Sequence, residues 1–282
     1  MPEPMVGLHV SAEGSVALAF ERARDLGATT FQIFTRNPNR WAFKPVPDDI
    51  VGAFREERSK GGFARVVDHM PYLPNLASPD RATKKISRYT LSEELKRCDA
   101  LGIDYLVVHL GSHLGKGSAI GVANIAEACD QAIAGSRGET MILLENMAGQ
   151  KNCVGARFEE LRAILDRTAK GERVGVCLDS CHMWAAGFDV GSDEAVGNTM
   201  GLFKEVVGFD MLKVIHLNDS KGPLGSKLDR HEDIGKGKIG RKGIKALLHY
   251  PGIGERPLIM ETPYDDVSTM KQRIKLVRTL LP

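Results

Sequence analysis

The chain contains eight short runs that are almost continuously apolar and rich in β-branched residues. Such runs are typical of parallel strands that are buried on both faces. The runs span Met5–Val10, Thr29–Thr35, Ala64–His69, Tyr105–Leu110, Met141–Asn146, Val174–Ser180, Met211–Asn218 and Pro257–Thr262. Because they recur along the whole length of the chain, we expect eight parallel strands in one sheet.

Segments with apolar residues at helical spacing lie between these runs. They span Glu13–Leu26, Ser92–Leu101, Ser118–Ala134, Arg157–Thr168, Asp193–Val207, Arg241–Leu248 and Asp265–Leu281. Gly102 is placed to end the second segment, because glycine adopts the left-handed conformation that commonly closes a helix. Strands that alternate with helices over 282 residues predict an α/β fold, a (β/α)8 TIM barrel that forms a single domain over residues 1–282.

The residues at the ends of the eight runs predict where function lies, because active sites of such barrels are built at the C-terminal strand ends. The eight runs end near His9, Thr35, His69, His109, Glu145, Asp179, His216 and Glu261. Six successive ends are thus His, His, Glu, Asp, His and Glu, which are ligands for zinc or a similar divalent metal. Six converging ligands exceed what one ion needs. We therefore expect a metal site with at least two ions at this end of the barrel.

The stretch from Ile215 to Gly240, which reads IHLNDSKGPLGSKLDRHEDIGKGKIG, carries two further candidate ligands. Asp229 and His231 are two positions apart, so in an extended loop both side chains can reach one ion. The surrounding basic residues are Lys221, Lys227, Arg230, Lys236, Lys238, Arg241 and Lys242. Metal ligands within a basic surface indicate an anionic substrate.

The segment Gly235–Gly240 matches the glycine pattern of dinucleotide-binding folds. It lacks the preceding strand and the following acidic residue that such a fold requires, so we interpret it as a flexible turn that contacts phosphate.

Composition narrows the class of protein. The formal net charge of +2 argues against a globally basic binder and leaves room for a local basic face. Neither a secretory signal nor an apolar run long enough for a membrane helix is visible, so we expect no membrane partner. The five cysteines are odd in number and form no C-x-x-C pair. A reducing compartment fits them best, and we expect a cytoplasmic protein, associated with the nucleoid in a prokaryote.

Several segments together resemble the endonuclease IV family, the zinc-dependent apurinic/apyrimidinic (AP) endonucleases of base-excision repair. The segments are HMPYLPNLASP from His69, HLGSH from His109, LENMAGQ from Leu144, CLDSCH from Cys177, AAGFD from Ala185, HLNDSK from His216 and ETP from Glu261. The similarity runs almost from end to end, and the combination is far more specific than any one segment.

The resemblance implies three zinc ions, with Mn²⁺ as an alternative at one position. Its ligand set falls on His69, His109, Glu145, Asp179, His182, His216, Asp229, His231 and Glu261. Glu145 would bridge a first ion, held by His69 and His109, to a second. Asp179, His216 and Glu261 would complete the second ion, and His182, Asp229 and His231 would hold the third.

The resemblance also implies the reaction, which is cleavage of duplex DNA 5′ to an abasic site to leave a 3′-hydroxyl and a 5′-deoxyribose phosphate. A 3′-repair phosphodiesterase activity is expected beside it. Two ions can clamp an in-line phosphoryl displacement, and the nucleophile would be a metal-held hydroxide rather than a side chain. Glu145 is then the catalytic bridging carboxylate. We expect the enzyme to be a monomer.

Candidate DNA contacts lie in loops that follow the predicted strands. Asn39 and Arg40 follow the second strand, and Tyr72 and Leu73 follow the third. Apolar side chains in a groove can unstack and kink a duplex, and an abasic nucleotide costs less to extrude than a stacked one. The phosphate contacts are expected from the basic side chains Arg230, Lys236 and Lys238.

Two other functions remain open from the sequence. A sugar isomerase of the xylose-isomerase-like barrel type also places Glu, Asp and His at strand ends, and a damaged-DNA binder without catalysis would share the basic loops. We expect His9 and His113 to have structural or outer-shell positions, since the metal site is already filled. Cys181 is interpreted as a buried inert thiol.

Overall fold

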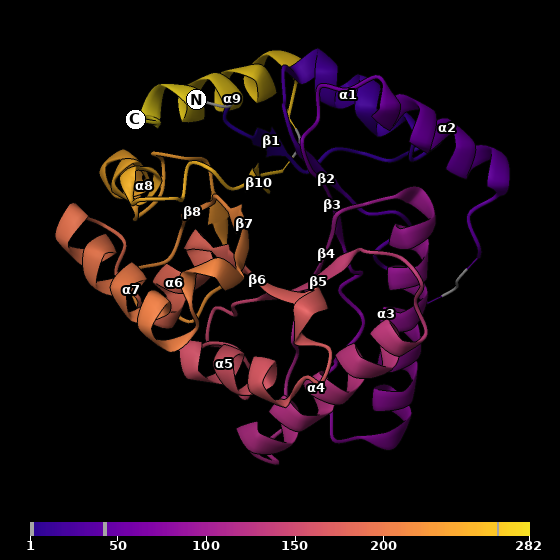
Figure 1. Ribbon diagram of the computed structural model, residues 1–282. Coiled ribbons are helices and arrows are strands. Elements are labelled where there is room, and N and C mark those ends of the chain that lie inside the picture. The colour runs from indigo at the N-terminus through magenta and orange to yellow at the C-terminus, as the bar shows by residue number, and fades with distance from the viewer. Residues whose placement is uncertain (1–2, 42–43, 264) are drawn as a thin grey trace.

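The computed structural model describes residues 3–41, 44–263 and 265–282. Within these residues eight parallel strands form one sheet that curves into a barrel (Figure 1). The strands are β1 (Val6–Leu8), β2 (Phe31–Ile33), β3 (Val66–His69), β4 (Tyr105–Val108), β5 (Met141–Glu145), β6 (Val174–Asp179), β7 (Leu212–His216) and β10 (Leu258–Met260). Each predicted run contains one of these strands, and the predicted TIM barrel is confirmed.

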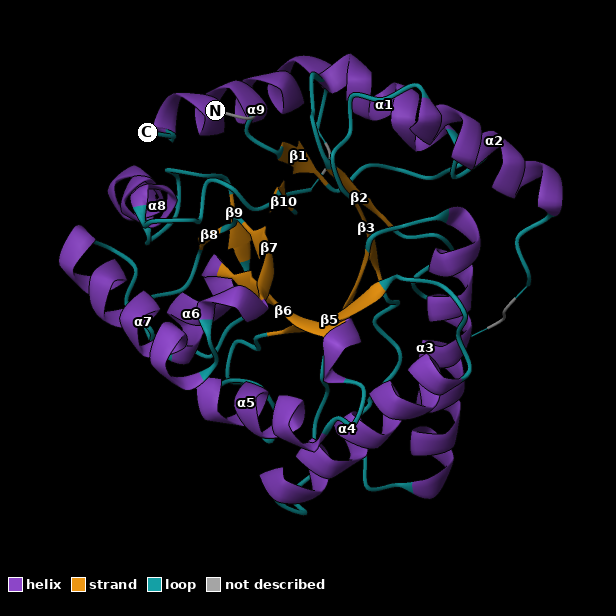
Figure 2. Cartoon of the chain, in the orientation of Figure 1, coloured by secondary structure: helices purple, strands orange, loops and turns teal. Residues whose placement is uncertain are grey.

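Helices surround the barrel on its outer side (Figure 2). In the described parts of the chain they are α1 (Leu18–Leu26), α2 (Asp48–Ser59), α3 (Arg81–Leu101), α4 (Ser118–Ala134), α5 (Phe158–Arg167), α6 (Ser180–Ala186), α7 (Asp193–Val206), α8 (Gly240–His249) and α9 (Val267–Leu280), with the 3-10 turns η1 (Gly171–Arg173) and η2 (Phe209–Met211). All seven predicted helical segments overlap one of them. Gly102 ends α3 with φ 76°, as predicted.

One helix begins much earlier than predicted and two helices were not predicted, and side-chain caps explain two of these three differences. α3 begins at Arg81 rather than Ser92, because the Asp80 carboxylate accepts a hydrogen bond of 2.8 Å from Thr83 N. α6 was not predicted; it begins directly after β6, where Asp179 Oδ1 accepts from His182 N at 2.7 Å. α2 was also not predicted, and Phe54 is the one buried residue that it contributes.

The order of the sheet is β1-β10-β7-β6-β5-β4-β3-β2, so β1 and β2 must meet to close the barrel. They meet at an isolated parallel bridge between His9 and Gln32, where Val10 N donates to Gln32 O at 2.8 Å. A second contact joins Thr29 N to Val6 O at 3.0 Å. We call this pairing of β1 with β2 the seam.

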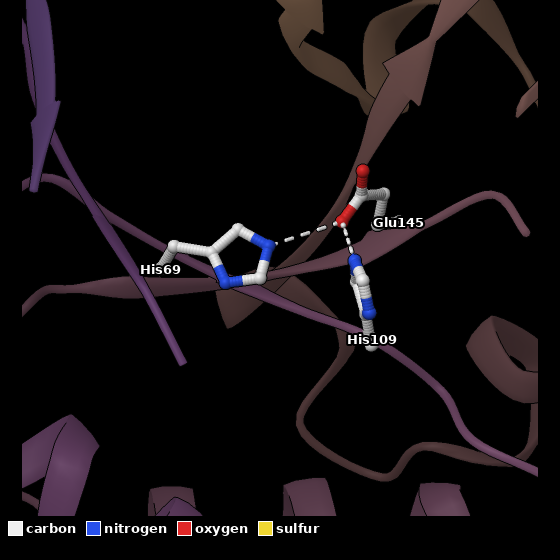
Figure 3. Close-up of side chains that lie close together, drawn as sticks. All are labelled: His69, His109 and Glu145. Carbon is white, nitrogen blue, oxygen red and sulfur yellow. Dashed lines mark hydrogen bonds and ion pairs between the residues drawn. The ribbon is translucent and has the colours of Figure 1, made fainter. Parts of the chain in front are cut away.

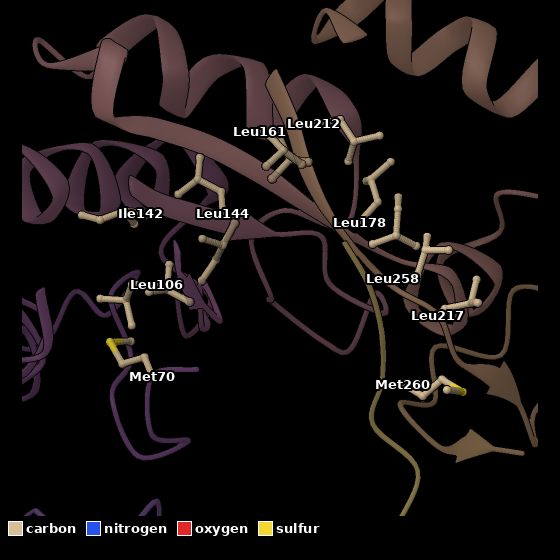
Figure 4. Packing of buried hydrophobic residues seen from close by; sticks show 14 of the residues in the cluster. Met70, Leu106, Ile142, Leu144, Leu161, Leu178, Leu212, Leu217, Leu258 and Met260 are labelled. Carbon is tan, nitrogen blue, oxygen red and sulfur yellow. The ribbon is translucent and has the colours of Figure 1, made fainter. Parts of the chain in front are cut away.

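Two apolar layers flank the sheet. The inner layer fills the barrel with one residue from each of six strands: Val67, Val107, Leu143, Cys177, Val214 and Ile259, all fully buried. The outer layer lies between strands and helices and includes Leu106, Leu144 and Leu178 (Figure 4). The inner layer makes the barrel a packed core rather than a pore, as in other TIM barrels.

Two short strands lie outside the barrel. β8 (Asp219–Ser220) pairs antiparallel with β9 (His231–Glu232), and this pairing returns the basic loop between them to the end of β7. Over the described residues, no helix combines the length and apolar character needed to cross a bilayer.

The seam depends on a glycine. A Cβ atom at Gly7 would lie 1.8 Å from the backbone oxygen of Thr30, and backbone atoms cannot rotate away as a side chain could. We expect G7A to lower the free energy of unfolding by about 1–3 kcal/mol or more, the usual cost of overpacking. The control is G52A within α2, where a Cβ meets nothing within 4 Å. The G52A substitution should raise the free energy of unfolding by up to about 1 kcal/mol, because alanine has a higher helix propensity than glycine. Urea denaturation measures both, and a G7A protein as stable as the wild type would contradict the close approach.

Candidate metal centre

The strands place a polar ring directly above the apolar inner layer. Side chains at positions i and i+2 of a strand share a face, so the residue two positions after an inner-layer residue also points inward. His69 follows Val67 in this way, and Glu261 follows Ile259. The same relation holds for His109, Glu145, Asp179 and His216. The six predicted strand ends therefore converge at the C-terminal mouth of the barrel.

A first group of candidate ligands contains His69, His109 and Glu145, whose ligand atoms all lie within 4.8 Å of one another. Figure 3 shows both imidazoles directed at the same carboxylate oxygen. Glu145 Oε2 lies 3.3 Å from His69 Nε2 and 3.1 Å from His109 Nε2. Glu145 and His69 are buried, whereas the side chain of His109 is 23% exposed and faces the mouth of the barrel.

A second group contains Glu145, Asp179, His216 and Glu261. It uses the other oxygen of Glu145, because Oε1 lies 2.9 Å from His216 Nδ1. The same nitrogen is 3.0 Å from Glu261 Oε2. Glu145 thus presents one oxygen to each of two adjacent groups.

A third group contains His182, Asp229 and His231. Asp229 Oδ1 lies 3.1 Å from His182 Nε2 and 3.4 Å from His231 Nε2. Both nitrogens are buried, and neither has a hydrogen-bond partner among the described residues despite this closeness. A cation that binds between the nitrogens and the carboxylate would account for this arrangement, because it would take the place of the missing hydrogen bonds. Asp179 and His182, three positions apart, fall in different groups.

The electrostatics of the three groups favour positive charge. Burial raises the pKa of Glu145, but the neighbouring His109 and His216 lower it well below its usual range. Burial lowers the pKa of His182, whereas the surrounding carboxylates, led by that of Asp179, raise it well above its usual value. Four carboxylates thus draw cations into a buried space, and divalent metal ions can take the place of protons there.

Hydrogen bonds from the outer nitrogen of two histidines orient the inner nitrogen of each toward the ligand groups. His69 Nδ1 donates to Met70 O at 2.7 Å, and His182 Nδ1 donates to Asn146 O at 2.9 Å. Each bond fixes the tautomer and leaves Nε2 as the inward lone pair, as is usual for metal-binding histidines. The described residues therefore fit a metal centre in both the donor set and its support.

A fourth group, Asp179, Cys181 and His231, offers a thiol as an alternative ligand. Burial, with Asp179 next in effect, raises the pKa of Cys181 to about 12. A thiol that retains its proton is a poor ligand, because metals bind the thiolate.

Three buried amides around the ring were missed by the sequence analysis. Asn146 Oδ1 accepts from Asp179 N at 2.6 Å, and Asn218 Nδ2 donates to Asp179 Oδ2 at 2.6 Å. Gln32, on β2, also points at the ring and contacts His216 and Glu261. The only signal in the sequence is a polar residue within or just after an otherwise apolar run.

His9 and His113 lie outside the ligand groups found among the described residues. Burial lowers the pKa of His9 to about 4, so its ring is neutral near pH 7. His113 Nδ1 accepts from Gly117 N at 3.0 Å and thereby closes a turn before α4. Both positions agree with the structural or outer-shell placement expected from the sequence.

Thr35, the end of the second run, turns away from the ring. Its backbone N donates to Asp68 Oδ1 at 3.0 Å, and its hydroxyl donates to Glu94 Oε2 at 3.1 Å. Burial, and next the Glu94 carboxylate, raise the pKa of Asp68 to about 8. Arg36 pairs with Glu94 as well, so this buried network anchors the loop that carries Asn39 and Arg40. Both of those residues are exposed.

Tyr72 and Leu73 lie beside the first group of candidate ligands, as the sequence predicts for a loop that follows His69. Tyr72 is 55% exposed and Leu73 is 37% exposed. The Tyr72 ring centroid lies 5.7 Å from that of His69 and 5.8 Å from that of His109. An exposed aromatic ring therefore borders the first group.

The basic turn Gly235–Gly240 is held by a single carboxylate. Asp219, fully buried, accepts hydrogen bonds of 2.8–3.2 Å from the backbone nitrogens of Ser220, Gly235, Gly237, Ile239 and Gly240. The turn is thus neither flexible nor free to bind phosphate through these amides, and that part of the expectation is wrong. Its exposed side chains Lys236 and Lys238 remain available, as does Arg230, although Lys236 Nζ is 2.8 Å from Asp233.

Residues 20–280 match the family of xylose-isomerase-like TIM barrels, and the fold and the ring of ligands define this chain as one of them. A protein from Methanoculleus marisnigri named "Probable endonuclease 4" is 46% identical over 277 residues, which cover 98% of each chain. The crystal structure of endonuclease IV from Thermus thermophilus superposes with a TM-score of 0.88 at 35% identity and covers 98% of each chain. The chain belongs to the endonuclease IV family, and the resemblance seen in its sequence is confirmed.

A D-psicose 3-epimerase structure matches with a TM-score of 0.64 at 18% identity and covers 96% of this chain and 89% of its own. At that identity the likeness shows a shared fold alone.

Replacing the carboxylate that holds the basic turn tests its part in the structure. D219N puts an NH₂ group against backbone N–H donors and removes a charge, so several buried amides lose their acceptor. We expect the free energy of unfolding to fall by at least about 2 kcal/mol, since hydrogen bonds to charged groups contribute about 1.5–3 kcal/mol each. Hydrogen exchange at Gly235, Gly237 and Ile239 should accelerate at least tenfold. D265N, at a side chain that is 59% exposed, is the control and should change neither quantity. Unchanged exchange in D219N would contradict the assignment.

Proposed function

We propose that this member of the endonuclease IV family hydrolyses the phosphodiester 5′ to abasic sites in duplex DNA and leaves a 3′-hydroxyl and a 5′-deoxyribose phosphate. A 3′-repair phosphodiesterase activity would use the same centre. The observation that carries the proposal is the placement of Glu145, whose two oxygens face two different ligand groups. A carboxylate in this position can join two cations at the separation that phosphoryl transfer requires.

We infer three zinc ions as the resident metals, with Mn²⁺ as an alternative at one position. His69 and His109 would hold the first, Asp179, His216 and Glu261 the second, and His182, Asp229 and His231 the third. Glu145 would be shared by the first two. Zinc at such a centre supplies Lewis acidity toward phosphate oxygens and toward water.

The side chains of the chain itself orient the substrate and keep the charges in place. Glu145 stays ionised and is immobilised by contacts to His109 and His216. No side-chain nucleophile is needed, and the thiols near the ring do not supply one. Burial raises the pKa of Cys177 and of Cys181 to about 12, so both remain protonated. The apolar layer beneath the ring closes the floor of the site to water.

Duplex DNA would lie across the mouth of the barrel. Arg230, Lys236 and Lys238 are exposed and would meet its phosphates. Tyr72 and Leu73 would enter the groove beside the abasic nucleotide, and Asn39 and Arg40 would contact the duplex from the anchored loop after β2. We further infer a monomeric, cytoplasmic enzyme, nucleoid-associated in a prokaryote, with which the five free thiols agree.

The first test measures cleavage of a duplex with one abasic site, beside an undamaged duplex and a panel of sugars, with metal content determined by elemental analysis. We expect cleavage of the abasic duplex alone and three ions per chain. Turnover of a sugar would favour the isomerase alternative, and abasic binding without cleavage would favour a non-catalytic binder.

The second test replaces the shared carboxylate. E145Q preserves shape but removes the charge that faces both groups, so we expect cleavage to fall at least 100-fold while DNA binding persists. E159Q, at an exposed position in α5, is the matched control and should cleave at the wild-type rate. Gel-based cleavage and binding isotherms measure the two effects. A near wild-type rate for E145Q would refute the bridging assignment.

Lesion recognition can be separated from phosphate binding. Replacing Tyr72 and Leu73 by Ala should weaken binding to abasic DNA tenfold or more, because stacking contributes about 1–3 kcal/mol per aromatic contact. Metal content should not change, since neither residue is a proposed ligand. Replacing Lys236 and Lys238 by Gln should instead weaken the binding of damaged and undamaged DNA alike. It should also reduce the dependence of binding affinity on salt concentration. Binding isotherms on both duplexes at several salt concentrations make the comparison. If the Tyr72/Leu73 variant keeps its full preference for abasic DNA, the wedge assignment fails.

A further inference from the structure

Gln32 makes three side-chain contacts at the edge of the metal ring. It is fully buried on β2 and forms the bridge to His9 that closes the seam. Its Nε2 lies 2.7 Å from Glu261 Oε1 and 3.2 Å from His9 Nδ1. Its Oε1 lies 2.8 Å from His216 Nε2. One amide therefore touches two proposed ligands of the second ion and one outer histidine.

The chemistry of these contacts permits a single orientation of the amide. A carboxylate group that binds a metal accepts hydrogen bonds through its oxygens, so the Gln32 atom at 2.7 Å from Glu261 Oε1 must be the NH₂ group. The opposite orientation would place two oxygens against each other at this distance. The second hydrogen of the NH₂ group then points to His9 Nδ1, which accepts it.

The orientation of the amide determines which nitrogen of His216 carries a proton. Gln32 Oε1 is an acceptor, so His216 Nε2 must donate to it. The nitrogen left for a metal is Nδ1, and this atom lies 2.9 Å from Glu145 Oε1 and 3.0 Å from Glu261 Oε2. His216 is thus turned so that its ligand atom faces both carboxylates of the second group.

This support differs from that of the other anchored histidines. His69 and His182 donate to the backbone carbonyls of Met70 and Asn146, which any residue could supply at those positions. His216 depends on a side chain, which substitution can remove. A proposed ligand of the second ion therefore depends on an outer residue that is open to mutation.

We propose that Gln32 is a positioning residue for the second metal ion, because it sets the ligand nitrogen of His216 and holds the carboxylate of Glu261 toward the same point. This inference rests on the proposed function, in which that point is occupied by zinc. Outer residues of this kind typically change metal affinity by about 10–100-fold.

The test compares zinc affinities of the full-length protein without DNA. Q32M keeps the length and approximate volume of the side chain but removes its donor and acceptor. Competition with a chelator should show one zinc ion bound about 10–100-fold more weakly, with the other two unchanged. I33V is the matched control, because Ile33 is equally buried on the same strand but packs in the outer layer. It should leave all three affinities at wild-type values.

A second measurement does not depend on the variant folding. In the zinc-loaded wild-type protein, ¹⁵N-resolved NMR should find the His216 proton on Nε2 and slow exchange of that proton with solvent. A proton on Nδ1 would overturn the proposal. The proposal would also be overturned if the Q32M protein is folded, as judged by circular dichroism, and either keeps all three zinc affinities or loses all three to the same extent. Failure of the proposed function has a different signature, namely a wild-type protein that does not cleave abasic DNA or does not bind zinc.

Discussion

Successive side chains of a β-strand face opposite sides, and in a closed barrel of parallel strands one of those sides is the interior. The inward-pointing side chains stack in layers along the barrel axis, and the side chains of one layer pack against one another. Here an apolar layer that includes Val67 and Val107 supports a polar layer two residues further along, where His69 and His109 lie. A shift of one residue in β5, for example, would place Glu145 among the helices and Leu144 in the polar layer.

The polar layer is costly, because charged groups are buried in it and each must be paired. Hydrogen bonds from surrounding groups offset this cost and hold several of the buried side chains in a single orientation. Backbone carbonyls hold His69 and His182, and the amides of Gln32, Asn146 and Asn218 hold Asp179, His216 and Glu261. The same solution recurs at Asp219, where backbone amides surround a buried carboxylate. Rigid support of this kind is what a preorganised site requires.

The sequence predicts the barrel and the ring well because both follow from short-range patterns, namely apolar runs and the polar residues that end them. The sequence predicts the role of a residue less well where that role depends on contacts with residues far away in the chain. Gln32 lies within the run FQIF, and only its distance to Glu261 shows what it does. His182 sits on a helix rather than at a strand end, so only the family resemblance identified it. The turn Gly235–Gly240 was interpreted as flexible because its acceptor, Asp219, lies far earlier in the chain.

The seam has a consequence for the proposed metal centre. β1 and β2 are joined by few hydrogen bonds, and the bridge that closes them contains His9 and Gln32, the residues next to the second ligand group. An opening of the seam would withdraw Gln32 from His216 and Glu261. Any ion that binds only the closed barrel must then stabilise closure by mass action, and the stabilisation grows with the logarithm of the free ion concentration once that concentration exceeds the Kd. If zinc occupies the proposed centre, zinc supply and closure of the barrel are thermodynamically linked, and loss of the second ion would weaken the contacts between β1 and β2.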